Sequence, residues 1–410
     1  WQDRWPASLE FSRRARRAYC KELHLFPCRP ASWFDVASSL SQTVYLNCRV
    51  TMGPNSEDQG IEVDVKQIRR FLRSSLSQES SNSERWHSFA KACHRQEQKQ
   101  HCLVRALQLD PRNAEAWATL GEFYLDEGDL VLAGKSFEQT RSLNPAIASA
   151  WEGLALMKEE QRRRGVVGDF QTNQELQEEE ILGCLLHAVR LGPTLRAAVM
   201  LSHYVLARIE CDGIEEQAKG SSGALNLSSC LSLKAERSLH EAYLGLMKAC
   251  EAHPYNLGSA ILLGCVCEAR TLYLDAIRAY RRVRAVLATT EHAAGQQGRV
   301  ELAQICLGNL ARCLCRVGQH NEAVTVFAEM DSLKMLDKDA LGLQCYAAAL
   351  SSVGSKQAAA EVAYRAIAVA EVQCGSRTES CETLRDREAR NVWGSVLSGR
   401  AAILSQASSE

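Results

Sequence analysis

The chain has 410 residues, of which 24% are charged, and its formal net charge is −1. This balance gives no global attraction to nucleic acid or anionic lipid, so any RNA contact has to be local. Only eight residues are Pro, and Ala, Leu, Glu and Arg are abundant, which predicts an almost entirely helical chain. A chain of this length without a sharp change in composition favours a modular or repeating build.

The first residues, the lack of a long apolar run and the cysteines limit the class of protein further. The chain begins with Trp, and its first residues lack the layout of a signal peptide, so we expect a piece of a longer protein. No run approaches the roughly 18 consecutive apolar residues of a membrane helix, which predicts a soluble protein without membrane contact. The 17 Cys are scattered through apolar helical stretches, a pattern typical of buried free thiols in a reducing compartment.

Residues 1–80 predict degenerate helical units. Ala15, Tyr19 and Pro27 close one unit, and Trp33 opens the next. The polar stretch near 51–60 predicts a loop between two helices of a unit. The following region, 81–256, contains further units, the first of which ends at Pro111.

The clearest unit begins at Ala114. Its first helix carries the pattern W-x-x-L-G-x-x-Y, Gly128 breaks that helix, and a second helix carries small and aromatic residues before Pro145 ends the unit. This is the 34-residue tetratricopeptide pattern, in which small residues let two helices approach and aromatic residues fill the gap between units. The residues of this signature are Trp117, Leu120, Gly121, Tyr124, Ala133, Phe137, Pro145 and, opening the next unit, Trp151.

The same register recurs in the regular units that we predict over 257–370, before a C-terminal capping helix region at 371–410. The matching residues are Leu263, Gly264, Ala276, Tyr280, Gly318, Ala323 and Phe327. A single unit cannot bury its apolar surface alone, so neighbouring units must stack. The sequence therefore predicts an all-α, tetratricopeptide-repeat right-handed superhelical solenoid.

The spacing of Pro145, Pro193 and Pro254 exceeds the 34-residue period, which predicts insertions near 162–180 and 211–230. Both stretches are polar and contain Gly, and we place them between the two helices of successive units. They should project from the same edge of the solenoid.

No nucleophile elbow, phosphate-binding loop or H-E-x-x-H helix occurs, so we predict no enzyme and assign no catalytic, metal or cofactor-binding residues. The stretch KACHRQEQKQHC brings Cys93, His94, His101 and Cys102 close in sequence. On one continuous helix the two His would be about 10 Å apart along the axis, which disfavours a shared zinc ion. Protein binding remains as the function.

Two surfaces are candidates for partner binding. In a tetratricopeptide stack, positions 2, 5, 9 and 12 of the first helix face the groove; here they are Glu115, Ala118, Glu122 and Leu125. This acidic to apolar set lacks the Lys and Asn with which co-chaperones bind a carboxylate.

The other candidate surface is basic. The predicted helix after Gly264 carries Arg278, Arg281 and Arg282, and 162–164 adds three more Arg. A basic face for RNA or an acidic partner is one interpretation, and we favour a solvated helix face.

The segment from Pro145 through Trp151 and Gly153 to 155–157 reads P-x-x-x-x-x-W-x-G-x-A-L-M. It resembles the C-terminal repeats of the tetratricopeptide scaffold subunits of superkiller complexes. The resemblance implies a non-catalytic scaffold that holds a DExH-type RNA helicase and beta-propeller subunits, with indirect or minor RNA contact. Such a complex acts with the cytoplasmic RNA exosome in 3′ to 5′ mRNA decay, which implies a cytoplasmic location and leaves a nuclear fraction open.

The alternative is an unrelated tetratricopeptide adaptor, in transport or ubiquitin-ligase assembly, that binds one extended peptide in its concave groove. A scaffold should bury convex and edge areas, whereas an adaptor should concentrate binding in the groove. The two interpretations therefore differ in the surface that they use.

Overall fold

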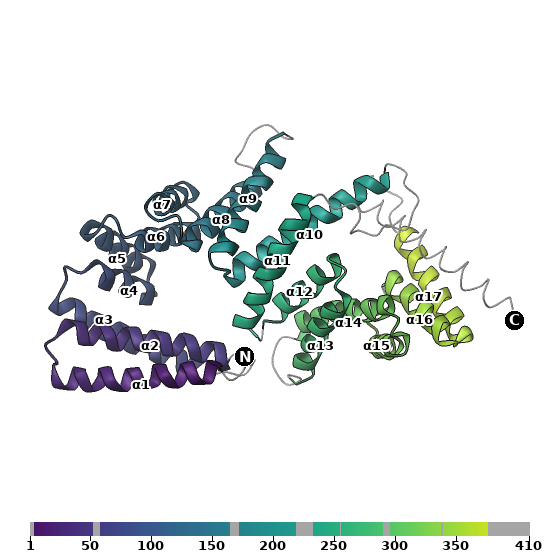
Figure 1. The fold of residues 1–410 in the computed structure, drawn as a ribbon, viewed down its shortest axis with the longest axis horizontal. Helices are drawn as coiled ribbons and strands as arrows, with labels where there is room; N and C mark the ends of the chain where they lie inside the picture. Colours follow the sequence, from purple (N-terminus) through teal and green to yellow (C-terminus); the bar gives the residue numbers. More distant parts are fainter. Residues whose placement is uncertain are drawn as a thin grey trace. The chain divides into compact units, whose positions relative to one another are not determined.

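The computed structural model describes residues 4–51, 58–164, 172–218, 233–254, 256–289, 296–337 and 339–375. These residues form 17 α-helices and no strand (Figure 1), so the predicted all-α tetratricopeptide fold is confirmed. The helices are α1 (Arg4–Leu25), α2 (Pro30–Thr51), α3 (Asp58–Gln78), α4 (Ser83–Ala92), α5 (Gln96–Leu109), α6 (Ala114–Asp126), α7 (Leu130–Leu143), α8 (Ala148–Arg163), α9 (Thr172–Leu191), α10 (Leu195–Ala218), α11 (Leu233–Ala252), α12 (Leu257–Ala269), α13 (Tyr273–Thr289), α14 (Gln296–Val317), α15 (His320–Ser332), α16 (Ala340–Val353) and α17 (Lys356–Gly375).

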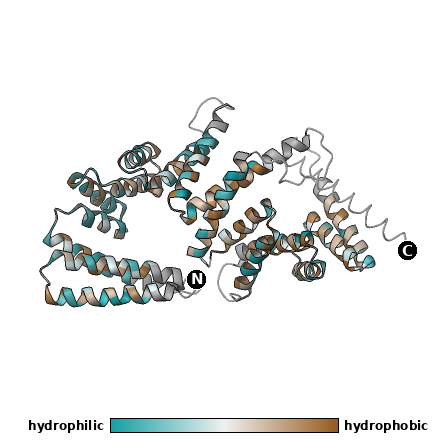
Figure 2. Ribbon diagram, viewed as in Figure 1, coloured by the Kyte–Doolittle hydropathy of each residue, from teal (hydrophilic) through white to brown (hydrophobic). Residues whose placement is uncertain are grey.

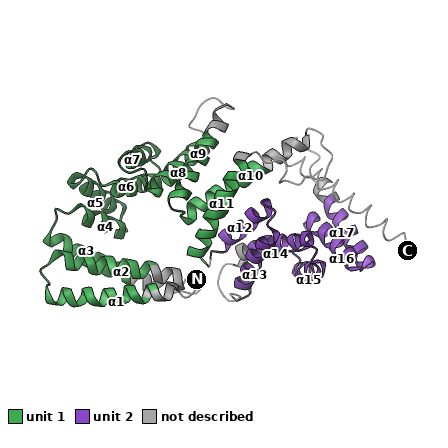
Figure 3. Ribbon diagram, in the orientation of Figure 1, with its two compact units in different colours: residues 1–223, 231–256 green, residues 224–230, 257–410 purple. Residues whose placement is uncertain are grey.

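The chain forms two compact units (Figure 3). Unit 1 comprises 1–223 and 231–256, and unit 2 comprises 224–230 and 257–410. Helices α1 to α11 thus belong to unit 1 and α12 to α17 to unit 2. The domain divisions that the sequence predicts, at 80, 256 and 370, rest on repeat register and stay predictions, and 376–410 lie outside the described residues.

Within each unit, consecutive helices pack as pairs. In unit 1 the pairs are α2 with α3, α4 with α5, α6 with α7, α8 with α9 and α10 with α11; in unit 2 they are α12 with α13, α14 with α15 and α16 with α17. The first helices of successive pairs also touch, as α6 does with α8 and α12 with α14. Most helices carry both hydrophobic and hydrophilic residues, as this packing requires (Figure 2).

One aromatic ring fills the centre of the best-conforming pair. The side chain of Phe137 on α7 is fully buried, and it lies against Gly121 on α6 and Gly153 on α8. A Cβ atom added to Gly121 or Gly153 would lie 2.6 or 2.3 Å from Cε1 of Phe137, closer than packed carbon atoms approach. The ring therefore occupies space that is available only because both residues lack a side chain.

The spacing between Pro and Trp has a structural reason. Each indole Nε1 donates a hydrogen bond to the backbone carbonyl six residues earlier, in the turn that precedes its helix. The four bonds are Trp33 to Pro27 at 2.7 Å, Trp86 to Ser80 at 2.8 Å, Trp117 to Pro111 at 2.9 Å and Trp151 to Pro145 at 2.9 Å. These bonds hold the first turns of α2, α4, α6 and α8 against the turn that precedes each helix. The bond from Trp86 shows that Ser80 can take the place of Pro at this position.

The predicted insertions fall within helix pairs. Residues 52–57, 165–171 and 219–232 separate α2 from α3, α8 from α9 and α10 from α11, and they lie outside the described residues. Part of each longer insertion is helical, because 172–180 belong to α9 and 211–218 to α10. The Pro spacing predicts a loop for these residues, but the stretch QELQEEE within them contains only strong helix formers and no Gly or Pro. Among the described helices, none is long and apolar enough to cross a membrane.

Candidate protein-interaction surface

The inner face of the stack is defined here by register positions 2, 5, 9 and 12 of the first helices. On α6, Glu115 and Glu122 are exposed and Leu125 is half-buried. Ala118, in contrast, is only 3% exposed, since its short side chain does not reach beyond the neighbouring helices. Glu115 and Glu122 thus offer more surface to a partner than Ala118 does, and the role of all three in partner binding stays a prediction.

Glu122 is the centre of a group of charges drawn from several helices. Its carboxyl is surrounded by Glu152 on α8, Lys91 on α4 and Lys99 on α5. Desolvation by the surrounding helices and, after it, repulsion from Glu152 raise the pKa of Glu122, and the two Lys oppose this shift. Thr194 donates a hydrogen bond of 2.6 Å from Oγ1 to Glu152. This part of the inner face is thus mixed in charge, where the sequence of α6 alone indicated an acidic to apolar surface.

A buried histidine lies beside these charges. His87 on α4 is 5% exposed, and its Nε2 lies 2.9 Å from Oγ1 of Thr119 on α6. Burial, with a contribution from Lys91, lowers the pKa of His87 to about 4. The imidazole is therefore neutral near pH 7, and the contact joins the first helices of two successive pairs. Sequence reasoning missed it because neither residue belongs to the repeat signature.

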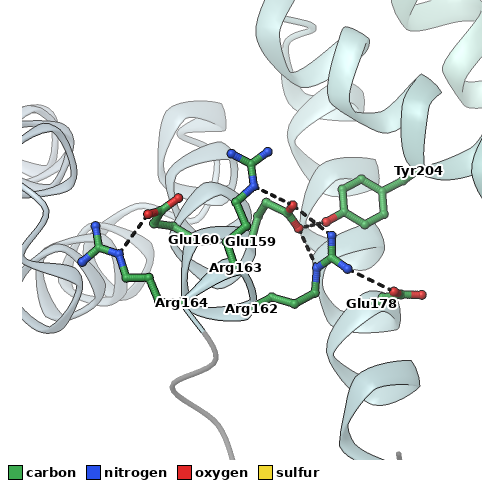
Figure 4. Close-up of polar contacts among 7 residues, drawn as sticks. All are labelled: Glu159, Glu160, Arg162, Arg163, Arg164, Glu178 and Tyr204. Carbon is green, nitrogen blue, oxygen red and sulfur yellow. Dashed lines mark hydrogen bonds and ion pairs between the residues drawn. The ribbon is translucent and has the colours of Figure 1, made fainter. Parts of the chain in front are cut away.

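A second polar cluster surrounds Glu159 near the end of α8 (Figure 4). Its carboxylate accepts hydrogen bonds from Nε and Nη2 of Arg162, both at 3.0 Å, from Nε of Arg163 at 3.2 Å, and from the hydroxyl of Tyr204 on α10. Burial alone would raise the pKa of Glu159, but the bonds from Arg162 and Tyr204 lower it below its ordinary value. Arg162 also pairs with Glu178 on α9 at 3.6 Å. The cluster thus ties α8, α9 and α10 together.

The basic run 162–164 has partners within the chain. Besides the contacts of Arg162 and Arg163, Arg164 pairs through Nε with Glu160 at 2.9 Å and donates from Nη1 to the carbonyl of Gly128 at 3.0 Å. These contacts favour a structural role for the run over an RNA-binding face.

The three consecutive glutamates at 178–180 of α9 also have partners within the chain. Glu178 contacts Arg162, Glu179 pairs with Arg208 on α10 at 3.5 Å, and Glu180 pairs with Lys158 on α8. These three consecutive carboxylates therefore connect neighbouring helices while they stay partly exposed to solvent.

The arginines of α13 also face acidic side chains. Arg281 donates from Nη2 to both carboxylate oxygens of Glu322 on α15, at 2.8 and 2.7 Å, and Arg284 contacts Glu329 at 2.6 Å. Arg278 pairs with Asp275 of its own helix at 2.9 Å, and Arg282 is exposed. Two of these four arginines therefore link the second helices of successive pairs, and the role of Arg278, Arg281 and Arg282 in partner binding stays a prediction.

The signature residues are distributed as a packing role requires. Buried positions are Leu120, Gly121, Ala133, Phe137, Gly264, Ala276, Tyr280, Ala323 and Phe327. Half-buried positions are Trp117, Tyr124, Trp151 and Leu263, while Pro145 and Gly318 are exposed in turns. Gly318 has a φ of +84°, which favours Gly at the end of α14.

Cys93 and Cys102 lie on either side of a turn and do not share a helix. The helix α4 ends at Ala92 and α5 begins at Gln96, so a turn separates them. Across the described ranges, no group of three or more His, Cys, Asp or Glu side chains is placed to hold a metal ion.

The chain is similar in sequence to known proteins. No known family profile matches the chain. It is 24% identical over 301 residues to tetratricopeptide repeat protein 37 of Xenopus laevis, covering 72% of this chain and 17% of that protein. It is also 24% identical over 303 residues to superkiller complex protein 3 of Mus musculus, covering 73% of this chain and 17% of the relative.

The chain therefore spans about a sixth of the length of the curated relatives that it matches, since 17% of each is covered. Among solved structures, yeast Tom70 aligns over 91% of this chain and 63% of its own, with 12% identity and a TM-score of 0.40. The repeat signature, the paired helices and the two sequence alignments lead to one conclusion: the chain has an all-α tetratricopeptide-type fold and resembles superkiller complex protein 3 at low identity.

Proposed function

We propose that this chain is part of a non-catalytic scaffold that assembles a superkiller-type helicase complex, which acts with the cytoplasmic RNA exosome in 3′ to 5′ mRNA decay. The partners are protein subunits, namely an RNA helicase and beta-propeller proteins. Contact with RNA is indirect or minor, and the location is cytoplasmic.

The observation that carries the proposal is the extent of the similarity. The alignment with superkiller complex protein 3 covers 73% of the chain and so includes most of its repeats.

The charged surfaces support a scaffold more than a nucleic-acid interface. Arg162, Arg281 and Arg284 form ion pairs with carboxylates of the same chain. RNA binding through them would require breaking these pairs before phosphate could be neutralised.

Apolar side chains at the edges of the helix pairs offer a surface for protein subunits. Val131 at the start of α7 is 65% exposed, and Leu274 at the start of α13 is 59% exposed. Both stand at the same position of their repeats, one in each unit. Burial of such side chains against a subunit gives favourable free energy of association.

The test is affinity purification of the full-length protein at low salt, with the bound proteins identified by mass spectrometry. Co-purification of a DExH-type helicase together with beta-propeller proteins is the expected result. If neither is recovered while the tagged protein remains folded, the superkiller proposal is wrong.

Two sets of substitutions locate the contact surface. The edge set, Val131→Ser with Leu274→Ser, should reduce recovery of the subunits. The groove set, Glu122→Gln with Glu152→Gln, should leave recovery unchanged and serves as the control. Loss of a single partner in the groove set alone would instead support the peptide-adaptor alternative.

A further inference from the structure

Two thiols meet where α4 turns into α5. Cys93 caps the C-terminal end of α4 and is half-buried, and Cys102 on α5 is 3% exposed. Both pack in one apolar cluster with Ala90 and Leu103, and the two thiols are hydrogen-bonded to each other. The turn at 93–95 creates this contact between residues that one continuous helix would have kept apart.

Positive charge faces one of the two thiols. Arg69 and Arg73 on α3 lie close enough to Cys93 to act on its ionisation. The hydrogen bond from Cys102 and then these two guanidinium groups lower the pKa of Cys93 to about 7, although burial opposes the shift. Nε of Arg69 is buried without a hydrogen-bond partner among the described residues.

The two thiols have unlike chemical character. The pKa of Cys102 is raised, by its hydrogen bond to Cys93 and by burial. The lower pKa thus belongs to the more exposed thiol, Cys93, and the higher one to the buried Cys102, an arrangement that suits an attacking and a resolving cysteine. Wherever else a shift is resolved in the described part of the chain, the pKa of the Cys is raised, as at Cys184, Cys265 and Cys306.

Cys102 borders a pocket of about 540 Å³ between α3, α4 and α5. Its wall includes Arg73, Trp86, Phe89 and His101, with the Trp86 and His101 rings in edge contact at 6.3 Å. Part of the surface of the half-buried Cys93 is exposed to solvent, and the pocket leaves open space beside Cys102. A small molecule can thus approach the pair without the helices separating.

We propose that Cys93 and Cys102 form a redox-active dithiol that exchanges with a low-molecular-weight disulfide such as oxidised glutathione. The Cys93 thiolate attacks one sulfur of oxidised glutathione, which forms a mixed disulfide and releases one glutathione thiolate. Cys102 then loses its proton and attacks Sγ of Cys93, which forms the Cys93–Cys102 disulfide and releases the second glutathione thiolate. Two electrons pass to glutathione, and the two thiol protons end on the two glutathione molecules.

The disulfide links α4 to α5 within one helix pair. A dithiol is favoured over a metal site because no third ligand stands beside the two sulfurs in the residues that the structure describes. The turn shared by α4 and α5 thus carries chemistry that the repeat fold does not require.

The experiment uses the whole chain in buffers with varied ratios of reduced to oxidised glutathione, followed by acid quenching, alkylation and tryptic digestion. Cleavage after Lys91, Arg95, Lys99 and Arg105 releases the peptides ACHR and QHCLVR, each of which contains one cysteine of the pair. The expected product is the two peptides joined by a disulfide, formed by oxidised glutathione and reversed by the reduced form.

Substitutions separate the two steps. Cys102→Ser should trap Cys93 as the mixed disulfide with glutathione, and Cys93→Ser should abolish both products. Arg69→Gln should slow alkylation of Cys93 at pH 7 about fivefold if it raises the pKa by about one unit. Cys184→Ser, at a half-buried thiol on α9, is the matched control and should leave the joined peptides unchanged.

The proposal is overturned if Cys93 is alkylated no faster than Cys184 in the folded protein. It is equally overturned if oxidised glutathione yields no joined peptides, or only a persistent mixed disulfide, in the chain without substitutions. Circular dichroism of each variant shows whether the helices are intact.

Discussion

Single residues decide how closely the helices approach. Phe137 lies against two glycines on different helices, and Tyr280 lies against Gly264 in the same way in unit 2. Aromatic rings fill these spaces completely, so the free energy of unfolding is sensitive to any carbon atom added there. Conservative substitutions therefore test the packing directly.

Gly121→Ala should destabilise unit 1 by about 1–3 kcal/mol, because the new Cβ would lie 2.6 Å from the Phe137 ring. Gly183→Ala on α9 is the matched control, since a Cβ there meets no heavy atom within 4 Å. It should stabilise the protein by about 0.5–1 kcal/mol, the usual gain when Ala replaces Gly within a helix. Urea denaturation measures both, and equal effects of the two substitutions would contradict the packing described.

His87 makes stability depend on pH. The pKa of its imidazole is about 4 in the folded protein and 6.5 ordinarily. Below pH 6.5 the imidazole is therefore protonated in the unfolded chain but stays neutral in the folded protein until the pH approaches 4. Stability from this residue is complete above pH 6.5 and is lost as the pH falls towards 4, by up to about 3 kcal/mol.

The His87→Gln variant should lack this part of the pH dependence. Denaturation at pH 7 and pH 5 gives the difference, and carboxylates that titrate in the same range cancel between variant and parent. His240→Gln, at an exposed position of α11, is the control and should retain the full dependence. An identical loss in all three proteins would show that His87 makes no contribution.

At the scale of elements, second helices of successive pairs are joined by ion pairs. Arg281 and Arg284 on α13 contact Glu322 and Glu329 on α15, and Arg365 on α17 contacts Asp331 at the end of α15. These side chains are 30 to 48% exposed, so solvent screens them and each pair is modest. Their combined effect is to align helices that share little apolar contact.

A double-mutant cycle on Arg281 and Glu322, with Ala at each position, should give a coupling energy of about 0.3–1 kcal/mol. The coupling should fall at about 1 M salt, where the Debye length is only about 3 Å. Denaturation of the four proteins at both salt concentrations measures it. The Arg278–Asp275 pair, which lies within α13, is the control, since its loss should not affect α15.

At the scale of the whole molecule, the chain consists of two compact units in which each helix pair contacts its neighbours. Stability in such repeats is the sum of the intrinsic stability of each pair and of nearest-neighbour contacts. The effect of a destabilising substitution should therefore extend to neighbouring helix pairs of the same unit and decrease with distance from the substituted residue.

Gly264→Ala tests this, because its Cβ would lie 2.3 Å from the Tyr280 ring in unit 2. Hydrogen exchange followed by mass spectrometry should show faster exchange in α12, α13 and α14, with α6 and α7 unchanged. Gly121→Ala should show the reverse pattern. Uniform acceleration over all the described helices would mean that the two units unfold as one.

Much of the fold was predictable because the repeat signature is local. Trp117, Gly121, Phe137 and Pro145 act within one helix pair or on the next, so their spacing along the chain reports their packing. The lengths of α9 and α10 were not predictable from the Pro spacing alone, since a polar stretch such as QELQEEE suits both a loop and a helix.

The amino-acid sequence by itself determined an all-α stack of paired helices, because helix propensity and contacts between adjacent helices depend on residues close in the chain. Only the tertiary structure decided that Ala118 is buried, that Arg281 faces Glu322 and that Cys93 meets Cys102. Each of these depends on where a turn lies in the chain or on which side chains the neighbouring helix pair places against that position. Those are properties of the stacked chain, and no spacing within one repeat encodes them.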